Sequence, residues 1–191
     1  LVLVFARLFD GITDPIVGFI SDRIRTPWGR RKPFVLLGMP IYIFGICMLF
    51  IPPVTFSEIN VMGLSFNSGY PWMLVMLVIV YIGATIKDVP YSAWGAELSP
   101  DYNERTLVTS WRESFSVTGA LIGAFTPAII FFFGYTRPAD AVFFLSIAIA
   151  VVMPVLVLNT VISVPEFKIV EASKDKISLK DSLKYVWRNA P

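Results

Sequence analysis

Hydrophobic residues dominate five long stretches of the sequence, and short polar segments separate them. Each stretch is long enough to cross a hydrocarbon core of roughly 30 Å as a helix, which takes about 20 residues. Prolines and glycines recur inside the stretches, and membrane helices tolerate them because neighbouring helices satisfy the freed backbone groups. The pattern predicts an all-α polytopic membrane protein with transmembrane helices near residues 1–21, 33–52, 70–98, 106–133 and 139–164.

The composition agrees with this class and excludes others. Of the 191 residues, 55% are hydrophobic and 16% are charged, whereas a soluble domain carries about 25% charged residues. The lack of histidine removes the commonest general base and metal ligand, and the single cysteine, Cys47, excludes an internal disulfide. A net charge of +2 gives no footprint for nucleic acid. No nucleophile–base pair accompanies the acids in the spans, so we expect neither an enzyme nor a cofactor.

The charges of the polar segments predict the orientation. The loop at 22–32 holds five basic residues, the loop at 53–69 holds none, and the region 165–191 holds six. The positive-inside rule therefore places 22–32, 98–105 and 165–191 in the cytoplasm and the start of the chain outside. Because an apolar run already begins at Leu1, we expect the chain to begin inside a helix, with one further helix before it.

The region after the last span changes character. Around residues 177–187, apolar side chains surround lysines at helical spacing. This pattern predicts a short amphipathic helix on the cytoplasmic surface. The region also fits the start of a linker to a further membrane domain.

Ionisable residues inside a span are costly, so their presence indicates function. The first span carries Arg7, Asp10 and Asp14, which share one helix face with Thr13. Counted back from Asp22, Asp14 lies roughly 12 Å deep and Asp10 roughly 18 Å deep. Carboxylate and hydroxyl oxygens one turn apart suit Na⁺, and the two acids could instead share a proton. An Arg7–Asp10 pair that only ties helices together is the structural alternative, so the role of Arg7 stays open.

The third predicted span carries a second group of polar residues. Asp88 lies about 15 Å from the cytoplasmic end, which matches the depth of Asp10. Thr85 shares a face with Asp88, whereas Lys87 is rotated by about 100° from Asp88, so the two need not pair within the helix. Acids at matching depth on two helices predict a polar cavity at the midplane, where secondary transporters bind substrate and coupling ion.

The fourth predicted span adds Arg112, roughly 10 Å from its start, beside Trp111 and Glu113. An arginine and a carboxylate that face one cavity can hold several hydroxyls of a polyol, while an aromatic face stacks on its apolar side. A gate or a structural salt bridge formed by Arg112 and Glu113 is an equal alternative. A channel would repeat one ring of residues by symmetry, and no internal repeat is visible.

Two long segments resemble one transporter family. RLFDGITDPIVGFISDRIRTPWGRRKPF resembles the second helix and following loop of the glycoside-pentoside-hexuronide:cation symporters, the melibiose-permease-like branch of the major facilitator superfamily. DVPYSAWGAELSPDYNERT with the following TSWR resembles the fourth helix, its loop and the fifth helix. The chain is also similar to the lysophospholipid symporters of that branch. The resemblance implies the major facilitator fold, with this chain covering helices two to six of the first six-helix half and the central cytoplasmic loop.

The resemblance also implies residue roles. The coupling cation, Na⁺ or H⁺, would be bound by Asp10, Thr13, Asp14 and Thr85, with Na⁺ at Asp10 and Asp14. The sugar would contact Asp88 and Arg112. A loop that holds the cytoplasmic side shut until substrate binds would contain Gly18, Asp22, Arg23, Gly29 and Arg30, with simple anchoring by positive charge as the alternative.

Two positions depart from the family pattern. The aromatic residue that stacks on sugar is Ser92 here, and Trp111 or Tyr91 could take its place. Lys87 stands where the family has an apolar residue. If its ammonium reaches the acids, it could act as a built-in cation and favour proton coupling or uncoupled transport over Na⁺.

These features lead to three functional hypotheses. The first is cation-coupled symport of a sugar or glycoside by alternating access, by a protein of the plasma or inner membrane that we expect to be monomeric at full length. The second is symport of an amphiphile such as a lysophospholipid. The third, from a different class, is a membrane sensor or scaffold that does not transport.

Overall fold

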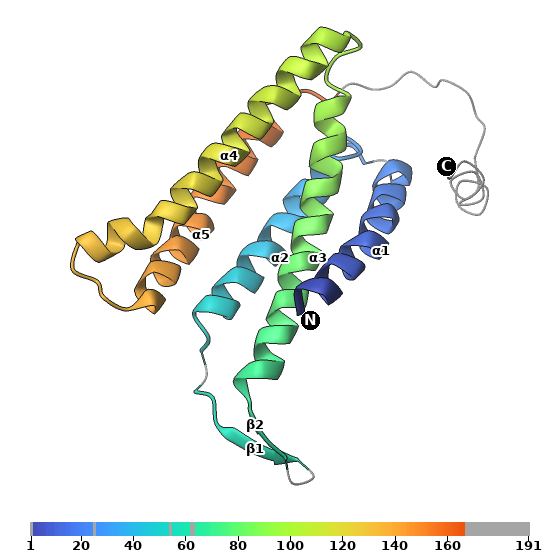
Figure 1. Cartoon of the computed structure of the whole chain (residues 1–191). Coiled ribbons are helices and arrows are strands. Elements are labelled where there is room, and N and C mark those ends of the chain that lie inside the picture. The colour runs from blue at the N-terminus through green and yellow to red at the C-terminus, as the bar shows by residue number, and fades with distance from the viewer. Residues whose placement is uncertain (1, 25, 54, 62–63, 167–191) are drawn as a thin grey trace, which may run out of the picture.

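The computed structural model describes residues 2–24, 26–53, 55–61 and 64–166, and the side chains among them apart from 2–10, 12 and 59–66. Five helices and one hairpin make up this part of the chain (Figure 1). They are α1 (Val2–Arg23), α2 (Lys32–Phe50), β1 (Glu58–Val61), β2 (Leu64–Asn67), α3 (Gly69–Ala96), α4 (Tyr102–Phe132) and α5 (Pro138–Ser163). The helical fold class is confirmed, and each helix overlaps one of the five predicted apolar stretches. The predicted amphipathic helix near 177–187 lies outside the described residues.

Four of the helices in the described chain, α2 to α5, are long and apolar enough to cross a membrane. The helix α1 has 22 residues, which is sufficient length, but it carries the charged residues Arg7, Asp10 and Asp14. Its place in the bundle follows from packing, because α1 contacts α3. The fold therefore contains four apolar spans and a fifth helix of sufficient length, α1, which carries charged residues and packs against α3.

Helices α2 and α3 form the closest pair in the fold. A Cβ atom added to Gly83 would lie 2.5 Å from the backbone nitrogen of Tyr42, and one added to Gly38 would lie 2.7 Å from the backbone nitrogen of Lys87. Gly45 faces α3 in the same way, at Val80. Small residues let two backbones approach closely in a membrane. Glycines thus fix the contact at the centre of the fold.

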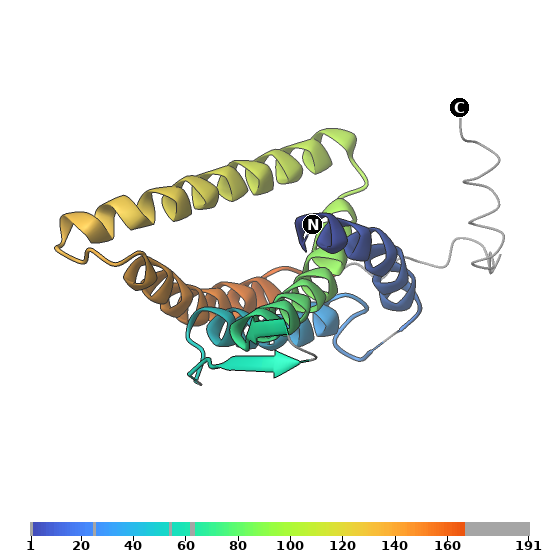
Figure 2. The same cartoon turned by 60° about the horizontal axis from the view of Figure 1, so that its bottom comes forward.

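The helix α4 is the least packed element. Figure 2 shows it standing apart from α2, α3 and α5 along much of its length and converging with α5 at its C-terminal end. None of its side chains is buried within the described chain. Its N-terminus is nevertheless well formed, because the Asp101 carboxylate accepts hydrogen bonds from the backbone N–H groups of Asn103 and Glu104.

The segment between α2 and α3 contains an antiparallel hairpin, β1 with β2, in which Glu58 pairs with Asn67 and Val61 with Leu64. The sequence predicts only a polar loop at 53–69. The hairpin lies at the opposite end of the helices from the loop between α1 and α2 (Figure 1). It therefore adds a small β element outside the helical layer without changing the fold class.

Candidate functional sites at the loop and in the bundle

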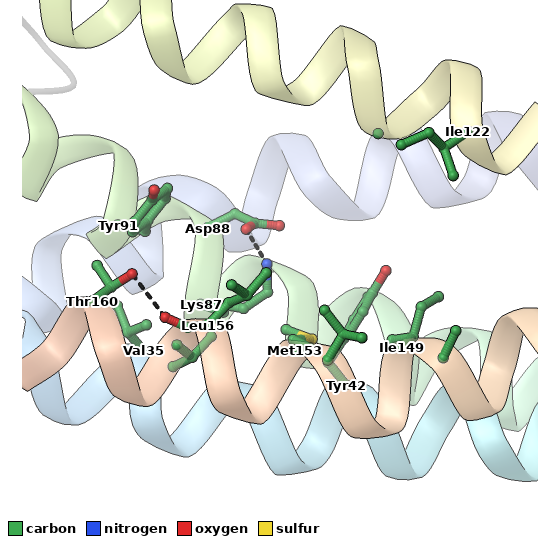
Figure 3. A pocket seen from close by; sticks show the side chains of 14 residues that line it. Val35, Tyr42, Lys87, Asp88, Tyr91, Ile122, Ile149, Met153, Leu156 and Thr160 are labelled. Carbon is green, nitrogen blue, oxygen red and sulfur yellow. Dashed lines mark hydrogen bonds and ion pairs between the residues drawn. The ribbon is translucent and has the colours of Figure 1, made fainter.

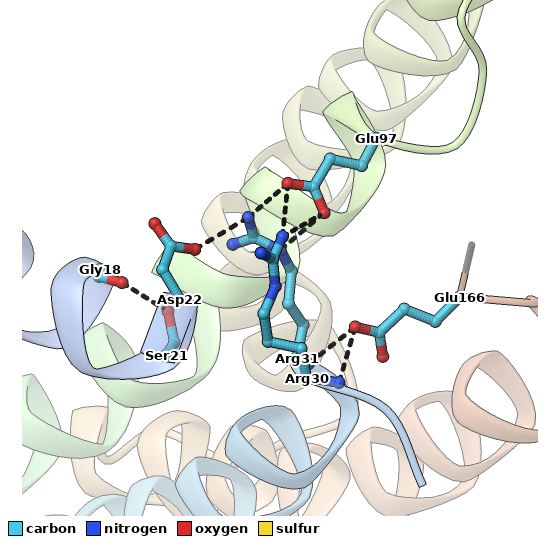
Figure 4. Close-up of polar contacts among 7 residues, drawn as sticks. All are labelled: Gly18, Ser21, Asp22, Arg30, Arg31, Glu97 and Glu166. Carbon is cyan, nitrogen blue, oxygen red and sulfur yellow. Dashed lines mark hydrogen bonds and ion pairs between the residues drawn. The ribbon is translucent and has the colours of Figure 1, made fainter. Parts of the chain in front are cut away.

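Charged side chains from four segments meet where α1, α3 and α5 end. We call this group the loop cluster: it comprises Asp22, Arg30, Arg31, Glu97 and Glu166 (Figure 4). A tight turn presents the two arginines, because the backbone groups of Thr26 and Gly29 bond each other at 3.1 and 3.2 Å. Gly29 has a φ of 118°, which favours glycine because it lacks a Cβ. The local sequence TPWG thus builds the turn that aims Arg30 and Arg31 at α3.

Glu97 is the centre of the loop cluster. Its two oxygens accept hydrogen bonds from Arg31 Nε at 3.0 Å and Arg31 Nη2 at 2.6 Å, which is bidentate geometry. Arg30 Nη2 donates to the same two oxygens at 2.8 and 3.0 Å. Arg31 Nη2 also lies 3.1 Å from Asp22 Oδ1 at the end of α1. The Arg31 side chain is only 6% exposed, so this arginine joins α1 and α3 from a buried position.

Glu166 attaches the end of α5 to the same loop. Its Oε1 atom accepts hydrogen bonds from the backbone N–H groups of Arg30 and Arg31 at 2.8 and 3.0 Å. These amides precede α2, where unpaired N–H groups and the helix dipole favour a carboxylate. A Cβ at Gly29 would lie 2.0 Å from Glu166 Oε2. The glycine therefore provides both the turn and the space for this carboxylate.

The charge state of Glu97 makes the loop cluster sensitive to acid. Burial alone would raise the pKa of the Glu97 carboxyl, but the hydrogen bonds and charges of Arg31 and Arg30 outweigh burial and lower it. A lowered pKa gives stability that is complete above the ordinary value of 4.5 and is lost as pH falls through the lowered pKa. We expect the melting temperatures of the full-length protein and its Glu97→Gln variant to converge as the pH falls through the lowered pKa of Glu97. A constant difference down to strong acid would contradict this origin of the stability.

The predicted gating residues divide between the loop cluster and its surroundings. Asp22 and Arg30 lie in the cluster, and Gly29 forms its turn. Gly18 lies one turn earlier on α1, where its carbonyl accepts a hydrogen bond of 2.9 Å from the fully buried Ser21. Arg23 instead stacks on the ring of Phe19, 3.8 Å from its centroid.

Three members of the loop cluster were not predicted from the sequence: Arg31, Glu97 and Glu166. The excess of basic residues in the loop at 22–32 could have indicated an acidic partner elsewhere, because a buried arginine requires one. Glu97 directly follows the apolar α3 and is the acid that this reasoning could have found. Glu166 has no comparable signal, because it binds backbone amides 135 and 136 residues away.

A cavity of about 590 Å³ lies between α2, α3, α4 and α5 (Figure 3). Its polar residues are Tyr42, Lys87, Asp88, Tyr91 and Thr160. Its α5 wall is mainly aliphatic, with Ile149, Val152, Met153, Leu156 and Val157. The cavity therefore combines one polar patch on α2 and α3 with an apolar wall, which is the usual composition of a small-molecule site.

The polar patch of the cavity contains an ion pair between Lys87 and Asp88. From the sequence alone the two need not pair, because their positions on α3 differ by about 100°. In the structure the four-carbon stem of Lys87 spans this difference, and its ammonium contacts Asp88 Oδ1. The same ammonium lies 5.3 Å from the centroid of the Tyr42 ring on α2. Lys87 thus has two partners inside the bundle.

Of the residues predicted to bind the cation, those whose side chains are described lie on two neighbouring helices. Gly18 of α1 faces Val89 of α3, since a Cβ at Gly18 would lie 3.7 Å from Val89 Cγ1. Both helices run towards the loop cluster. Asp14 lies four residues before Gly18 and Thr85 lies four residues before Val89, so Asp14 and Thr85 are at the same level of the bundle. Thr85 is buried, Thr13 is half-buried and Asp14 is exposed. Arg7 and Asp10 belong to α1, and their side chains lie outside the described part.

The predicted α4 residues lie away from the cavity. Arg112 Nη2 pairs with Glu113 Oε1 at 2.8 Å, and the Trp111 ring lies 6.0 Å from that of Phe115. The α4 residues that line the cavity are Gly119 and Ile122, and Gly119 is about two turns beyond Arg112. The structure therefore brings Asp88 and Tyr91 into one cavity and places Arg112, Trp111 and Glu113 on an exposed part of α4.

The described residues do not bring three or more histidine, cysteine or acidic side chains together as a metal site. A monovalent cation needs fewer acids, and the level shared by Asp14, Thr13 and Thr85 offers one carboxylate with two hydroxyls. These are the hard oxygen ligands that Na⁺ prefers. Cation binding by these residues stays a prediction.

Apolar spans that enclose a cavity with a charged patch, together with charged helix ends, indicate an integral membrane protein. The family described as "MFS/sugar transport protein" matches residues 1–191, and the chain belongs to this family. An uncharacterized symporter of Synechocystis sp. is 36% identical over 123 residues, which are 63% of this chain and 22% of that protein. The inner membrane symporter YicJ of Escherichia coli is 26% identical over 187 residues, which are 96% of this chain and 38% of that protein.

A third relative has a different kind of name. The sodium-dependent lysophosphatidylcholine symporter 1 of Mus musculus is 31% identical over 124 residues, which are 64% of this chain and 22% of that protein. The chain thus spans between about a fifth and two fifths of the lengths of these relatives. All three are named symporters, which fits the resemblance drawn from the sequence.

Proposed function

We propose that the full-length protein containing this chain is a secondary active transporter that couples uptake of a sugar or glycoside to Na⁺ or H⁺. The observation that carries the proposal is the acid Asp88 in a cavity between spanning helices, beside three hydroxyl-bearing residues. A carboxylate accepts hydrogen bonds from sugar hydroxyls, and tyrosine and threonine hydroxyls both donate and accept. The proposed partners of the full-length protein are thus a small-molecule substrate, a monovalent cation and the bilayer.

The loop cluster supports alternating access. It ties the ends of α1, α3 and α5 through Arg31, Glu97 and Glu166. We infer that this side faces the cytoplasm, because the loop at 22–32 has five basic residues. Breaking the cluster would release three helix ends at once and open the cavity to that side. The cytoplasmic side is then held shut by charge pairs that a substrate-driven change must separate.

The coupling cation would bind at the level of Asp14, between α1 and α3. Asp14→Asn in the full-length protein is expected to reduce cation-driven accumulation at least about tenfold, because coupling requires a favourable interaction between the two ligands. Uptake into proteoliposomes, measured with and without a Na⁺ or a pH gradient across a panel of sugars and glycosides, tests this. Asp140→Asn, at the first turn of α5, is the matched control and should transport like the wild type. Unchanged cation-dependent accumulation in Asp14→Asn would exclude this cation site.

The apolar wall of α5 favours a second candidate substrate, an amphiphile such as a lysophospholipid. Five aliphatic or thioether side chains face the polar patch across the cavity, and an acyl chain could lie against them. A competition experiment distinguishes the sugar from the amphiphile as substrate. If an amphiphile neither displaces bound sugar nor is itself taken up, the amphiphile alternative is excluded. A non-transporting sensor would show neither uptake of any substrate nor a cation-dependent change in tryptophan fluorescence.

A further inference from the structure

The cavity between α2, α3, α4 and α5 has a polar end and an apolar end. Figure 3 shows Tyr91 and Thr160 at one end and Ile122 and Ile149 at the other. Asp88 lies one turn from Tyr91 on the same face of α3, so its carboxylate is near the polar end. The volume of about 590 Å³ is within the range of pockets that enclose a small molecule. A single ligand that fills both ends must therefore carry hydroxyl groups at one end and an apolar group at the other.

One face of α5 forms the apolar wall of this cavity. Ile149, Met153 and Leu156 line it at helical spacing, and Thr160 follows one turn later. From Ile149 to Leu156 the wall is roughly 10 Å long, because a helix rises about 1.5 Å per residue. This length suits a phenyl group or a short alkyl chain and is well below the length of a long acyl chain.

The wall formed by α4 is open at Gly119. Gly119 and Ile122 are the α4 residues that line the cavity, three residues apart on one face. A Cβ added to Gly119 would meet no atom of the described structure within 4 Å, whereas one added to Gly38 or Gly83 would meet backbone atoms of a neighbouring helix. Gly119 therefore leaves space at the apolar end, and a larger side chain at this position would occupy it.

We propose that the apolar end is a subsite for the aglycone of a glycoside: the sugar ring lies at Asp88, Tyr91 and Thr160, and an aryl or short alkyl group lies between α4 and α5. This inference rests on the proposed transport function and names its substrate class, a glycoside with an apolar aglycone in place of a free sugar. The carboxylate and the hydroxyls bond the sugar hydroxyls, and enclosure of the aglycone removes apolar surface from water. The size of residue 119 then determines how large an aglycone the site accepts.

Glycosides that share one sugar and differ in the aglycone test this proposal. Methyl and butyl glycosides of D-glucose, D-galactose and D-xylose would be titrated calorimetrically into the full-length protein in lipid nanodiscs, with empty nanodiscs as the blank for partition into lipid. Each additional buried methylene tightens binding up to about fourfold, so the butyl compound should bind at least about tenfold more tightly than the methyl compound of the same sugar. Its binding should also have the more negative heat-capacity change, which marks burial of apolar surface. Equal affinities overturn the proposal, as would be found if a further helix of the full-length protein filled the apolar end.

Gly119→Leu and Gly123→Leu are matched variants for this test. At either position an added Cβ meets no atom of the described structure within 4 Å, but Gly119 lines the cavity and Gly123 is not among its lining residues. Gly119→Leu should lower the ratio of butyl to methyl affinity to about one, whereas Gly123→Leu should keep the wild-type ratio. A wild-type ratio in Gly119→Leu overturns the proposal.

Ile122→Ala replaces Gly119→Leu if that variant does not fold. The Ile122 side chain is 62% exposed within the described chain, so its truncation removes little packing. It should lower the ratio of butyl to methyl affinity at least about threefold, because the aglycone loses apolar contact. An unchanged ratio would contradict the subsite.

Failure of the subsite and failure of the transport function are distinguishable. If the methyl glycoside of one sugar binds and is taken up, and the butyl group brings no gain in affinity, the subsite alone is wrong. If no glycoside of the panel binds, the proposed transport function is wrong and the subsite with it.

Discussion

Glu97→Gln is expected to lower the free energy of unfolding of the full-length protein by about 3 kcal/mol, because it removes the charge partner of a buried arginine. Glu97 accepts four hydrogen bonds from Arg30 and Arg31, and Arg31 would keep only Asp22 as an acidic partner in the described chain. The value is at the lower end for a buried pair, since the Glu97 side chain is 27% exposed. Unfolding in detergent, followed by tryptophan fluorescence, measures this loss.

The matched control for this variant is Glu113→Gln. Glu113 pairs with Arg112 at the same 2.8 Å as Glu97 with Arg30, but its side chain is 60% exposed. Exposed pairs contribute at most about 1 kcal/mol, so this variant should unfold almost like the wild type. Similar losses in the two variants would show that the loop cluster is no more important than a surface pair.

Glu97→Gln also tests whether the loop cluster controls access from the loop side of the bundle. Ser21 is fully buried next to Asp22 of the loop cluster. In the variant Ser21→Cys, we therefore expect the thiol to become exposed to solvent only when the cluster opens. With Cys47 replaced by serine, a membrane-impermeant maleimide should react with this thiol at least about tenfold faster in Glu97→Gln, through a shift of the open population. An unchanged rate in a folded protein would exclude the cluster as a gate.

Gly83→Ala is expected to disrupt the central helix pair and to cost about 2 kcal/mol or more through overpacking. The added Cβ would lie 2.5 Å from the nitrogen and 2.7 Å from the Cα of Tyr42. These are backbone atoms, so relief requires α2 and α3 to separate. The change would also displace the Tyr42 ring, whose centroid lies 5.3 Å from the ammonium of Lys87. Melting temperature and the yield of folded full-length protein measure the effect.

Gly95→Ala is the control on the same helix. A Cβ at Gly95 meets nothing within 4 Å in the described structure. Alanine favours a helix over glycine by up to about 1 kcal/mol, so this variant should be neutral or slightly more stable. If both alanine variants melt alike, close approach at Gly83 does not hold the two helices together.

Helix positions were predictable because membrane spans depend on a simple average over about 20 residues. The hairpin at β1 and β2 was missed for the opposite reason. Its signal is an alternation over four residues per strand, with Ile59, Val61, Leu64 and Phe66 as the apolar positions. So short a pattern is weak beside the Ser, Asn and Gly content of the segment, which indicates a loop.

Residues of the cavity could be predicted from local signals in the sequence, whereas the contacts of the loop cluster depend on tertiary structure and could not. Asp88 and Tyr91 stand out as polar residues in an apolar helix, and the structure places both in the cavity. Glu97 acquires its partners from a loop 66 and 67 residues earlier, which no local pattern indicates. The Lys87–Asp88 pair was underestimated because helix-wheel angles describe where a side chain starts and ignore the reach of a lysine stem.

The docking of the α5 end onto the first loop has a consequence for biogenesis. Lys32 Nζ donates to the Val161 carbonyl at 2.7 Å, Trp94 Nε1 donates to the Pro165 carbonyl at 3.2 Å, and Glu166 accepts from Arg30 and Arg31. As the ribosome makes the chain, α1 to α4 enter the membrane before these acceptors exist. The amides preceding α2 must therefore remain in contact with water until about 135 further residues have been synthesised. Closure of the first loop is thus a late event, and it marks the point at which these five helices have assembled as a unit.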